Sequence, residues 1–385
     1  MQIKEIEVYI NELRYDEACF KKQDQSSSVV STVPARGIIY TWRAAGYIII
    51  SMLDYLLLLY FIHFKKKKLS GKRIVFTAKN FCTQSDGELE DRIVRPLFTE
   101  EIIFINQSKE IRLKRVNNQK VYNLGGLVKL ISHISFRGHS SLMKTFLSYR
   151  SVNDSIIRNF RDNELYMLWY YDLNSLALIF SRYRDRVKLI EVQHGSIINY
   201  PPYVKPAPVK IAELFYVKNQ STVDYLKVHL CANFPSEYRL IPYPHVERKY
   251  VPGLHIFYAS TVEFNGLHPV FKDFLKRSTY RDMNVIIRLH PREREKEGFF
   301  AEELSAFNIK YEFDHSKNWL ESNRISNMIV ISPWSSSLED AYDNGLIAIT
   351  IDTVGKERYK HLLDGNRFFY SLDLISTFNQ ITNEG

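Results

Sequence analysis

Two apolar runs that each stop at a polar turn constrain this chain more than any other feature. The run 283–289 is rich in β-branched residues and ends at His290-Pro291, where Pro291 lacks the N–H that a central strand needs. The run 328–332 ends at a serine turn, 335–337, whose hydroxyls suit the cap of a following helix. Strands of an open parallel sheet bind ligands at their carboxyl ends. We therefore predict an α/β sheet with an imidazole and a hydroxyl cluster at its ligand edge.

Composition sets the outer limits. The chain has 385 residues, 45% of them apolar and 25% charged, which is enough for two globular domains. Its three cysteines form no CxxC pair, so neither a disulfide framework nor a zinc site is indicated. A net charge of +9 indicates an anionic partner, which could be nucleic acid, anionic lipid or a phosphorylated substrate.

A long apolar segment lies near the beginning, at 44–64, after a polar stretch that has no secretory signal pattern. It ends in four lysines, 65–68, and carries Asp54 near its middle, where a carboxylate costs roughly 2.5–3.5 kcal/mol in a membrane span. Three alternatives remain open for this segment. It is a helix that covers a domain, a helix at the membrane interface with lysines toward anionic lipid, or a true span.

The first half reads as a series of strands with polar ends. Strands are predicted at 73–78, 101–105, 165–169 and 187–192. Asp172 follows the third of these strands, as a general base or as a helix N-cap. Gln193-His194-Gly195 follows the fourth, where the glycine permits a tight turn that lets His194 face a cleft.

A proline-rich stretch at 200–208 marks the predicted domain boundary. We expect an N-terminal domain at 1–205 and a C-terminal, nucleotide-binding domain at 206–385. The second half repeats the alternation, with strands at 210–217, 238–241, 254–260, 283–289, 328–332 and 346–352. Glu263 follows the strand at 254–260. Site candidates at strand ends in both halves imply a cleft between two domains.

Three motifs in this order resemble those of bacterial surface-polysaccharide glycosyltransferases. They are Gln193-His194-Gly195, Arg288-Leu289-His290-Pro291, and Ser335-Ser336-Ser337 with Glu339 downstream. The group includes capsule transferases, bacterial sialyltransferases and polysialyltransferases, 3-deoxy-manno-octulosonic acid (Kdo) transferases and CDP-glycerol polymerases. The resemblance covers residues 160–355 and implies the GT-B fold, in which two Rossmann-like domains face a central cleft.

The resemblance also implies roles for the matching residues. His290 would contact the phosphate or ribose of a cytidine nucleotide, and His194 would face the reaction centre. Ser335 and Ser336 would contact the phosphate, with Glu339 near the ribose. The full implied nucleotide-binding set is Arg288, His290, Pro291, Ser335, Ser336, Ser337 and Glu339.

The catalytic carboxylate is less defined, because this chain has no strict copy of the acidic motif that sialyltransferases use to deprotonate the acceptor hydroxyl. Asp172 is the nearest candidate by its position in the chain, and Ser85-Asp86-Gly87 is the nearest by its residue types. Glu263 is a third candidate, as base or, in a retaining reaction, as nucleophile. The predicted catalytic residues are therefore Asp172, His194 and Glu263.

Together these features predict transfer of an acidic sugar, sialic acid or Kdo, from a CMP-activated donor to a glycan hydroxyl. No Asp-x-Asp pair suggests a bound divalent ion, so we expect no metal or other cofactor. The expected acceptor is lipid-linked or an oligosaccharide, at the inner face of the cell membrane, where the protein would be cytoplasmic and peripheral. The basic residues outside 65–68 are dispersed, which disfavours nucleic acid as a partner. The alternatives are a CDP-glycerol or polyol phosphotransferase, a sugar-nucleotide epimerase and a non-catalytic membrane-docking scaffold.

Overall fold

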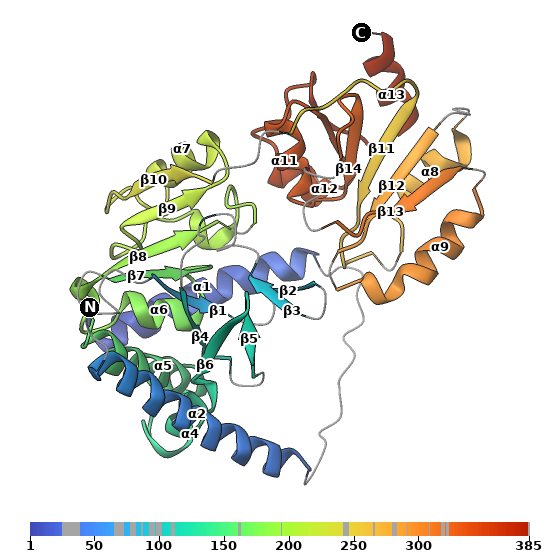
Figure 1. Ribbon diagram of the computed structural model, residues 1–385. Coiled ribbons are helices and arrows are strands. Elements are labelled where there is room, and N and C mark those ends of the chain that lie inside the picture. Colours follow the sequence, from blue (N-terminus) through green and yellow to red (C-terminus); the bar gives the residue numbers. More distant parts are fainter. Residues whose placement is uncertain are drawn as a thin grey trace. The chain divides into compact units, whose positions relative to one another are not determined.

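The computed structural model divides into two α/β units (Figure 1). The first unit consists of Met1–Glu17, Val30–Ile197 and Pro201–Tyr243, and the second of Ala18–Val29, Ile198–Tyr200 and Pro244–Gly385. The structure describes residues 1–24, 39–64, 73–77, 82–85, 88–91, 97, 102–108, 112–160, 163–193, 195–241, 246–264, 266–278, 283–290, 292–307, 309–316, 320 and 323–383.

A mainly parallel sheet forms the core of the first unit. Its strands, in the order in which they pair, are β10 (Glu237–Leu240), β9 (Leu214–Val217), β8 (Val187–Val192), β7 (Asn163–Met167), β1 (Arg73–Thr77), β4 (Ile102–Asn106), β6 (Gln119–Asn123) and β5 (Arg115–Val116). Only β5 pairs antiparallel among these strands, and β2 (Cys82–Ser85) and β3 (Glu88–Asp91) form a separate hairpin. The first strand therefore lies inside the sheet, with later strands added on both sides.

Among the helices of this unit, α2 and α4 approach each other especially closely. An added Cβ at Gly126 of α4 would lie 2.6 Å from Ser51 Oγ and from the Tyr47 carbonyl oxygen of α2, so only glycine allows this approach. The helices of the unit are α1 (Ile3–Asp24), α2 (Ile39–Phe64), α4 (Gly125–Ile134), α5 (Ser141–Ile157), α6 (Leu173–Ile179) and α7 (Gln220–Val228), with 3₁₀ turns at Arg184–Arg186 and Pro201–Tyr203.

The second unit is built on a fully parallel sheet. Its strands pair in the order β13 (Lys310–Phe313), β12 (Met283–Arg288), β11 (Leu254–Ala259), β14 (Met328–Ser332), β15 (Ile347–Thr350) and β16 (Phe368–Tyr370). Counted along the chain, this is the order 3-2-1-4-5-6 of dinucleotide-binding domains. Its helices are α8 (Pro269–Arg277), α9 (Glu297–Ser305), α11 (Ser337–Asp343), α12 (Thr353–Arg358) and α13 (Leu374–Asn383), with a 3₁₀ turn at Arg294–Lys296.

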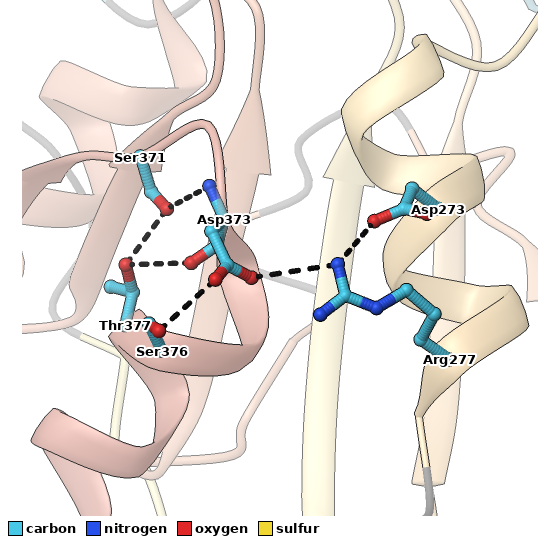
Figure 2. Close-up of polar contacts among 6 residues, drawn as sticks. All are labelled: Asp273, Arg277, Ser371, Asp373, Ser376 and Thr377. Atoms are coloured by element: carbon cyan, nitrogen blue, oxygen red, sulfur yellow. Dashed lines mark hydrogen bonds and ion pairs between the residues drawn. The ribbon is translucent and has the colours of Figure 1, made fainter.

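The last helix, α13, packs against α8, and Figure 2 shows the polar contacts around its first turn. Asp373, just before α13, accepts a 3.0 Å hydrogen bond from the Ser376 hydroxyl and lies 4.0 Å from the Arg277 guanidinium of α8. The rings of Phe274 and Phe378 stack beneath these contacts with centroids 4.9 Å apart. The C-terminal helix is thus part of the core of the second unit.

The predicted α/β class with two Rossmann-like domains, the composition of the GT-B fold, is confirmed by these two parallel sheets. The predicted strands at 187–192 and 328–332 are matched residue for residue by β8 and β14. Prediction missed β2, β3, β5, β6, β13 and β16. All but β16 carry polar or charged residues that interrupt the apolar run of a central strand, and β16 is apolar but only three residues long.

The predicted boundary between residues 205 and 206 lies too early in the chain. Strands β9 and β10 come after it, yet they extend the first sheet from β8, and the units change at Tyr243. The proline-rich stretch was misleading because it packs within the first unit, where Pro202 and Tyr203 are buried.

The apolar segment near the beginning forms α2, which packs on α4 and β6 of the first unit. Asp54 is buried against that packing face and accepts hydrogen bonds from the backbone N–H (3.0 Å) and side-chain amide (3.2 Å) of Asn123. This packing agrees with one of the three alternatives for the segment, a helix that covers a domain. Across the described ranges, no helix combines the length and the apolar character needed to cross a membrane.

Candidate functional site

The carboxyl ends of β11, β12 and β14 meet at one edge of the second sheet. β11 pairs in parallel with β12 on one side and with β14 on the other, and the direction in which successive strands are added to the sheet reverses between β11 and β14. In open parallel sheets this reversal point is where ligands bind. Glu263 follows β11, His290 follows β12 and the serine turn follows β14. The structure therefore brings three predicted groups to neighbouring loops of one unit.

One hydroxyl connects the end of β11 with the histidine corner after β12. Ser260 Oγ accepts a 2.8 Å hydrogen bond from the backbone N–H of His290 and donates a 2.6 Å bond to Glu293 Oε2. The Glu293 backbone N–H in turn donates to the His290 carbonyl oxygen over 2.7 Å. His290 Nδ1 accepts from the Arg292 N–H over 3.2 Å, so a neutral ring carries its proton on Nε2. The corner is thus held in one conformation with a defined donor.

Glu293 was missed from the sequence, where it is one of several charged residues after the His-Pro pair. It is 1% exposed, and Oε1 has no hydrogen-bond partner within the described part of the chain. Burial raises the pKa of this carboxyl group and nearby Glu263 raises it further, whereas Ser260 and Lys296 lower it. Burial and the neighbouring carboxyl group of Glu263 thus both raise the pKa of Glu293, three residues after His290.

A second hydroxyl connects the end of β11 with the serine turn. Ser332 Oγ donates to the Ala259 carbonyl oxygen over 2.8 Å and accepts from the Ser335 N–H over 3.0 Å. Ser335 Oγ then accepts from the Ser337 N–H over 3.3 Å. The serines were expected to cap the helix, but Ser336, at the N-cap position of α11, makes no side-chain cap bond. The Ser336 hydroxyl is therefore not used in capping.

Arg358 supplies a cation beside the serine turn and was not predicted. Its guanidinium Nη1 donates to the Trp334 carbonyl oxygen over 3.4 Å, and its Nε is buried with no hydrogen-bond partner among the described residues. The helix that carries it, α12, lies directly against this turn, since an added Cβ at Gly355 would be 2.0 Å from the Pro333 carbonyl oxygen. Sequence alone gave no signal for Arg358, because only this close packing brings it to the serines.

Two other members of the predicted nucleotide-binding set have structural partners in the second unit. Arg288 Nη1 lies 2.5 Å from Asp314 Oδ2 and 3.1 Å from the Ser316 carbonyl oxygen, and so connects β12 with the segment after β13. Glu339, in the first turn of α11, is 1% exposed. Arg288 therefore ties the end of β12 to the segment after β13, and Glu339 is enclosed within the unit.

In the first unit the order of strand addition reverses between the parallel strands β1 and β7, and Asp172 lies in the loop that follows β7. Its side chain is exposed and caps α6 by accepting the Asn174 N–H over 3.4 Å, which is the N-cap alternative. Trp169 in the same loop has φ +50°, a left-handed conformation that is strained for a non-glycine residue. The loop after β7 is therefore both at the ligand edge of its sheet and held in a costly conformation.

Strand β8 leads to the predicted motif at 193–195, of which His194 is outside the described residues. Gln193 fixes the strand end, since its side-chain carbonyl oxygen accepts the Lys218 N–H over 2.7 Å. Behind it, Glu191 is fully buried and accepts a 2.5 Å hydrogen bond from the Tyr203 hydroxyl. Burial raises the pKa of Glu191 to about 7, although hydrogen bonds from Tyr203 and Tyr170 lower it. Glu191 therefore titrates near neutral pH beneath the motif.

The predicted residues thus divide between the units. Glu263, His290, Ser335, Ser336, Ser337 and Glu339 lie on loops or the first helical turn at the ligand edge of the second sheet, with Arg288 at the end of β12. Asp172 lies at the equivalent edge of the first sheet, and Pro291 is outside the described residues. No group of three His, Cys, Asp or Glu side chains within the described ranges has a spacing suited to a metal ion.

Comparison with known proteins gives no family and no curated sequence that matches this chain. Solved structures do resemble it at low identity. An S. aureus MnaA–UDP structure has a TM-score of 0.45 at 10% identity and covers 82% of this chain and 87% of its own. UDP-GlcNAc 2-epimerase from Neisseria meningitidis bound to UDP-GlcNAc has a TM-score of 0.44 at 11% identity and covers 81% of this chain and 91% of its own. Acinetobacter baumannii MurG has a TM-score of 0.40 at 10% identity and covers 81% of this chain and 90% of its own.

Proposed function

We propose that this protein is a GT-B glycosyltransferase of bacterial surface-polysaccharide synthesis that transfers an acidic sugar from a CMP-activated donor to a glycan hydroxyl. The observation that carries the proposal is the pair of bridges at the end of β11. Ser260 holds the histidine corner and Ser332 holds the serine turn, so donors from two loops are fixed around one reversal point. Preorganised donors at such a point suit the departing phosphate of a nucleotide sugar.

In this proposal the nucleotide lies at the ligand edge of the second sheet. The His290 imidazole donates from Nε2 to a phosphate or ribose oxygen, and the hydroxyls of Ser335 and Ser336 donate to the phosphate. Arg358 adds the positive charge that stabilises CMP as it leaves. Arg288, Pro291, Ser337 and Glu339 complete the proposed nucleotide-binding set.

The acceptor hydroxyl must lose a proton as its oxygen attacks the anomeric carbon and CMP departs with the bonding electrons. A carboxylate is the natural base. We propose Asp172 or Glu263 for this role, with His194 at the reaction centre. A retaining reaction would use Glu263 as nucleophile instead, in two successive displacements. As part of the same proposal, the acceptor is lipid-linked or an oligosaccharide, the site needs no metal, and the protein works as a peripheral protein at the cytoplasmic face of the membrane.

Titration calorimetry with CMP, CDP, UDP and GDP tests the nucleotide pocket. The proposal expects selective cytidine nucleotide binding that His290→Ala weakens by about tenfold or more, because a hydrogen bond to a charged group is lost. His315→Ala is the matched control, since His315 is in the same unit and its side chain is 65% exposed. Equal binding by His290→Ala and the parent, or no binding of any nucleotide, would overturn the pocket. Preference for CDP with polyol transfer would instead favour the phosphotransferase alternative.

A further inference from the structure

A buried carboxyl group near the end of β8, that of Glu191, has no part in the reaction proposed above. Glu191 pairs with Met167, the last residue of β7, directly before the loop that carries Asp172. It is 1% exposed, and its Oε2 has no hydrogen-bond partner in the described part of the chain. Burying a carboxyl group is costly, and an apolar side chain would fill this position without that cost. The presence of an acid here therefore calls for a reason other than packing.

Two tyrosines connect Glu191 with the loop after β7 and with the turn Pro201–Tyr203. The Tyr203 hydroxyl donates to Glu191 Oε1 over 2.5 Å. From the loop, the Tyr170 hydroxyl donates to the Pro202 carbonyl oxygen of the turn. The rings of Tyr170 and Tyr203 are buried and pack edge to face, with centroids 5.2 Å apart. These contacts, which we call the tyrosine lock, join the loop to the turn and join the turn to β8 through Glu191.

The loop after β7 is also closed by hydrogen bonds of its own. The Trp169 carbonyl oxygen accepts the Asp172 N–H over 2.9 Å, and the Leu168 carbonyl oxygen accepts from the Ser175 hydroxyl over 3.0 Å. Trp169 has φ +50°, a conformation that persists only where the surroundings of a residue hold it. Asp172 is hydrogen-bonded to this strained residue, so a loop that relaxes at Trp169 moves Asp172 as well.

We propose that Glu191 is a positioning residue, which holds Asp172 in place through the tyrosine lock. The contacts run from Glu191 through the hydroxyl and ring of Tyr203 to Tyr170, the neighbour of Trp169 in the loop. A base must lie within hydrogen-bond reach of the acceptor hydroxyl, so a released loop should slow transfer and leave nucleotide binding unchanged. The task of Asp172 in transfer rests on the proposed function, whereas the hold on its loop rests on the contacts alone.

Hydrogen exchange of the full chain, followed by mass spectrometry of peptides that cover 168–176, tests the hold on the loop. Tyr203→Phe removes the hydroxyl and keeps the ring, so exchange in these peptides should become about tenfold faster. Glu191→Leu should have at least the same effect, because the buried Tyr203 hydroxyl loses its acceptor. Glu191→Gln keeps a carbonyl oxygen that accepts from Tyr203, so exchange should stay within about threefold of the parent rate.

Tyr166→Phe is the matched control, since the Tyr166 hydroxyl on β7 also donates to a glutamate, to Glu164 Oε2 over 2.7 Å. Its exchange in the loop should equal that of the parent. In a transfer assay, Tyr203→Phe and Glu191→Leu should lower kcat about tenfold with the KM for the donor unchanged, and Glu191→Gln should retain most of the parent kcat.

The proposal would be overturned if Tyr203→Phe and Glu191→Leu exchanged in the loop at the parent rate, or if Tyr166→Phe accelerated exchange there as much as Tyr203→Phe. Tyr203→Phe alone decides the matter if Glu191→Leu does not fold, because it removes a single oxygen atom. A parent that binds no nucleotide would count against the proposed function and not against the tyrosine lock, which the exchange rates test separately.

Discussion

Ser260 and Glu293 form a buried hydrogen bond of 2.6 Å between the loops that follow two neighbouring strands, β11 and β12. The same hydroxyl accepts the His290 N–H, so the carboxyl group acts on His290 through Ser260. Glu293 is therefore a positioning residue in our proposal. Its effect on nucleotide binding should depend on the oxygen that accepts the Ser260 hydrogen bond and not on the charge of the carboxyl group.

We expect Glu293→Ala to lower the free energy of unfolding by about 1–3 kcal/mol, because the buried Ser260 hydroxyl loses its acceptor. The same variant should weaken CMP binding about tenfold, as His290 loses its fixed position. Glu293→Gln keeps a carbonyl oxygen that accepts from Ser260, so it should retain most of the stability and most of the affinity for CMP. Chemical denaturation and calorimetry on the three proteins measure this. Equal losses in the alanine and glutamine variants would show that charge, not position, is what matters.

Arg358 should contribute to nucleotide binding through its charge. We expect Arg358→Gln to raise the Kd for CMP by about tenfold to a hundredfold, the usual range for a lost hydrogen bond to a charged group. Arg367→Gln is a close control, because Arg367 also donates to a carbonyl oxygen over 3.4 Å, that of Tyr342, and lies in the same unit. Calorimetry at low and high salt gives the comparison. Similar affinities for the two variants would remove Arg358 from the proposed site.

Glu191 should make the first unit less stable as the pH rises. Its pKa is about 7 in the folded protein against an ordinary value of 4.5, so the folded state holds a proton that the unfolded chain releases. The stabilisation is therefore complete below about pH 4.5 and is lost as the pH rises through 7, by at most about 3 kcal/mol.

Glu191→Gln resembles the protonated acid at every pH and should flatten this dependence. The measurement is the melting temperature between about pH 5 and about pH 8.5, a range that brackets the folded pKa of about 7. Relative to the parent, the variant should gain stability at the upper end of the range. Glu237→Gln serves as control, since Glu237 is an exposed residue of the same sheet. If the melting temperature of the Glu191→Gln variant changed with pH as steeply as that of the parent, the assignment to Glu191 would be contradicted.

Much of the second unit could be predicted from the sequence because its strands are short apolar runs that end in distinctive residues. The strand at 328–332 and the polar turns after 289 and 332 lie where the sequence placed them. Glu293 and Arg358 could not be found that way. They act through packing, and their sequence neighbours are equally charged, so no local pattern sets them apart.

The first unit was harder because its sheet ends where no local signal marks an end. β10 is mostly exposed and its apolar pattern is weak, so the proline-rich stretch at 200–208 gave the stronger indication of a boundary. The pairing of β8 with β9 joins residues that are distant in sequence, and local strand propensity cannot predict such a contact.

The strand order of the second unit also sets the sequence of events in its synthesis. β11 leaves the ribosome first but acquires β14 as a neighbour only after β12, α9 and β13 have been made. Until then, the side of β11 that will face β14 is an open edge, and Ser332 has not yet joined Ala259 to the serine turn. A nascent or truncated chain that stops before β14 would leave this edge of β11 unpaired and would lack the serine turn of the proposed nucleotide pocket.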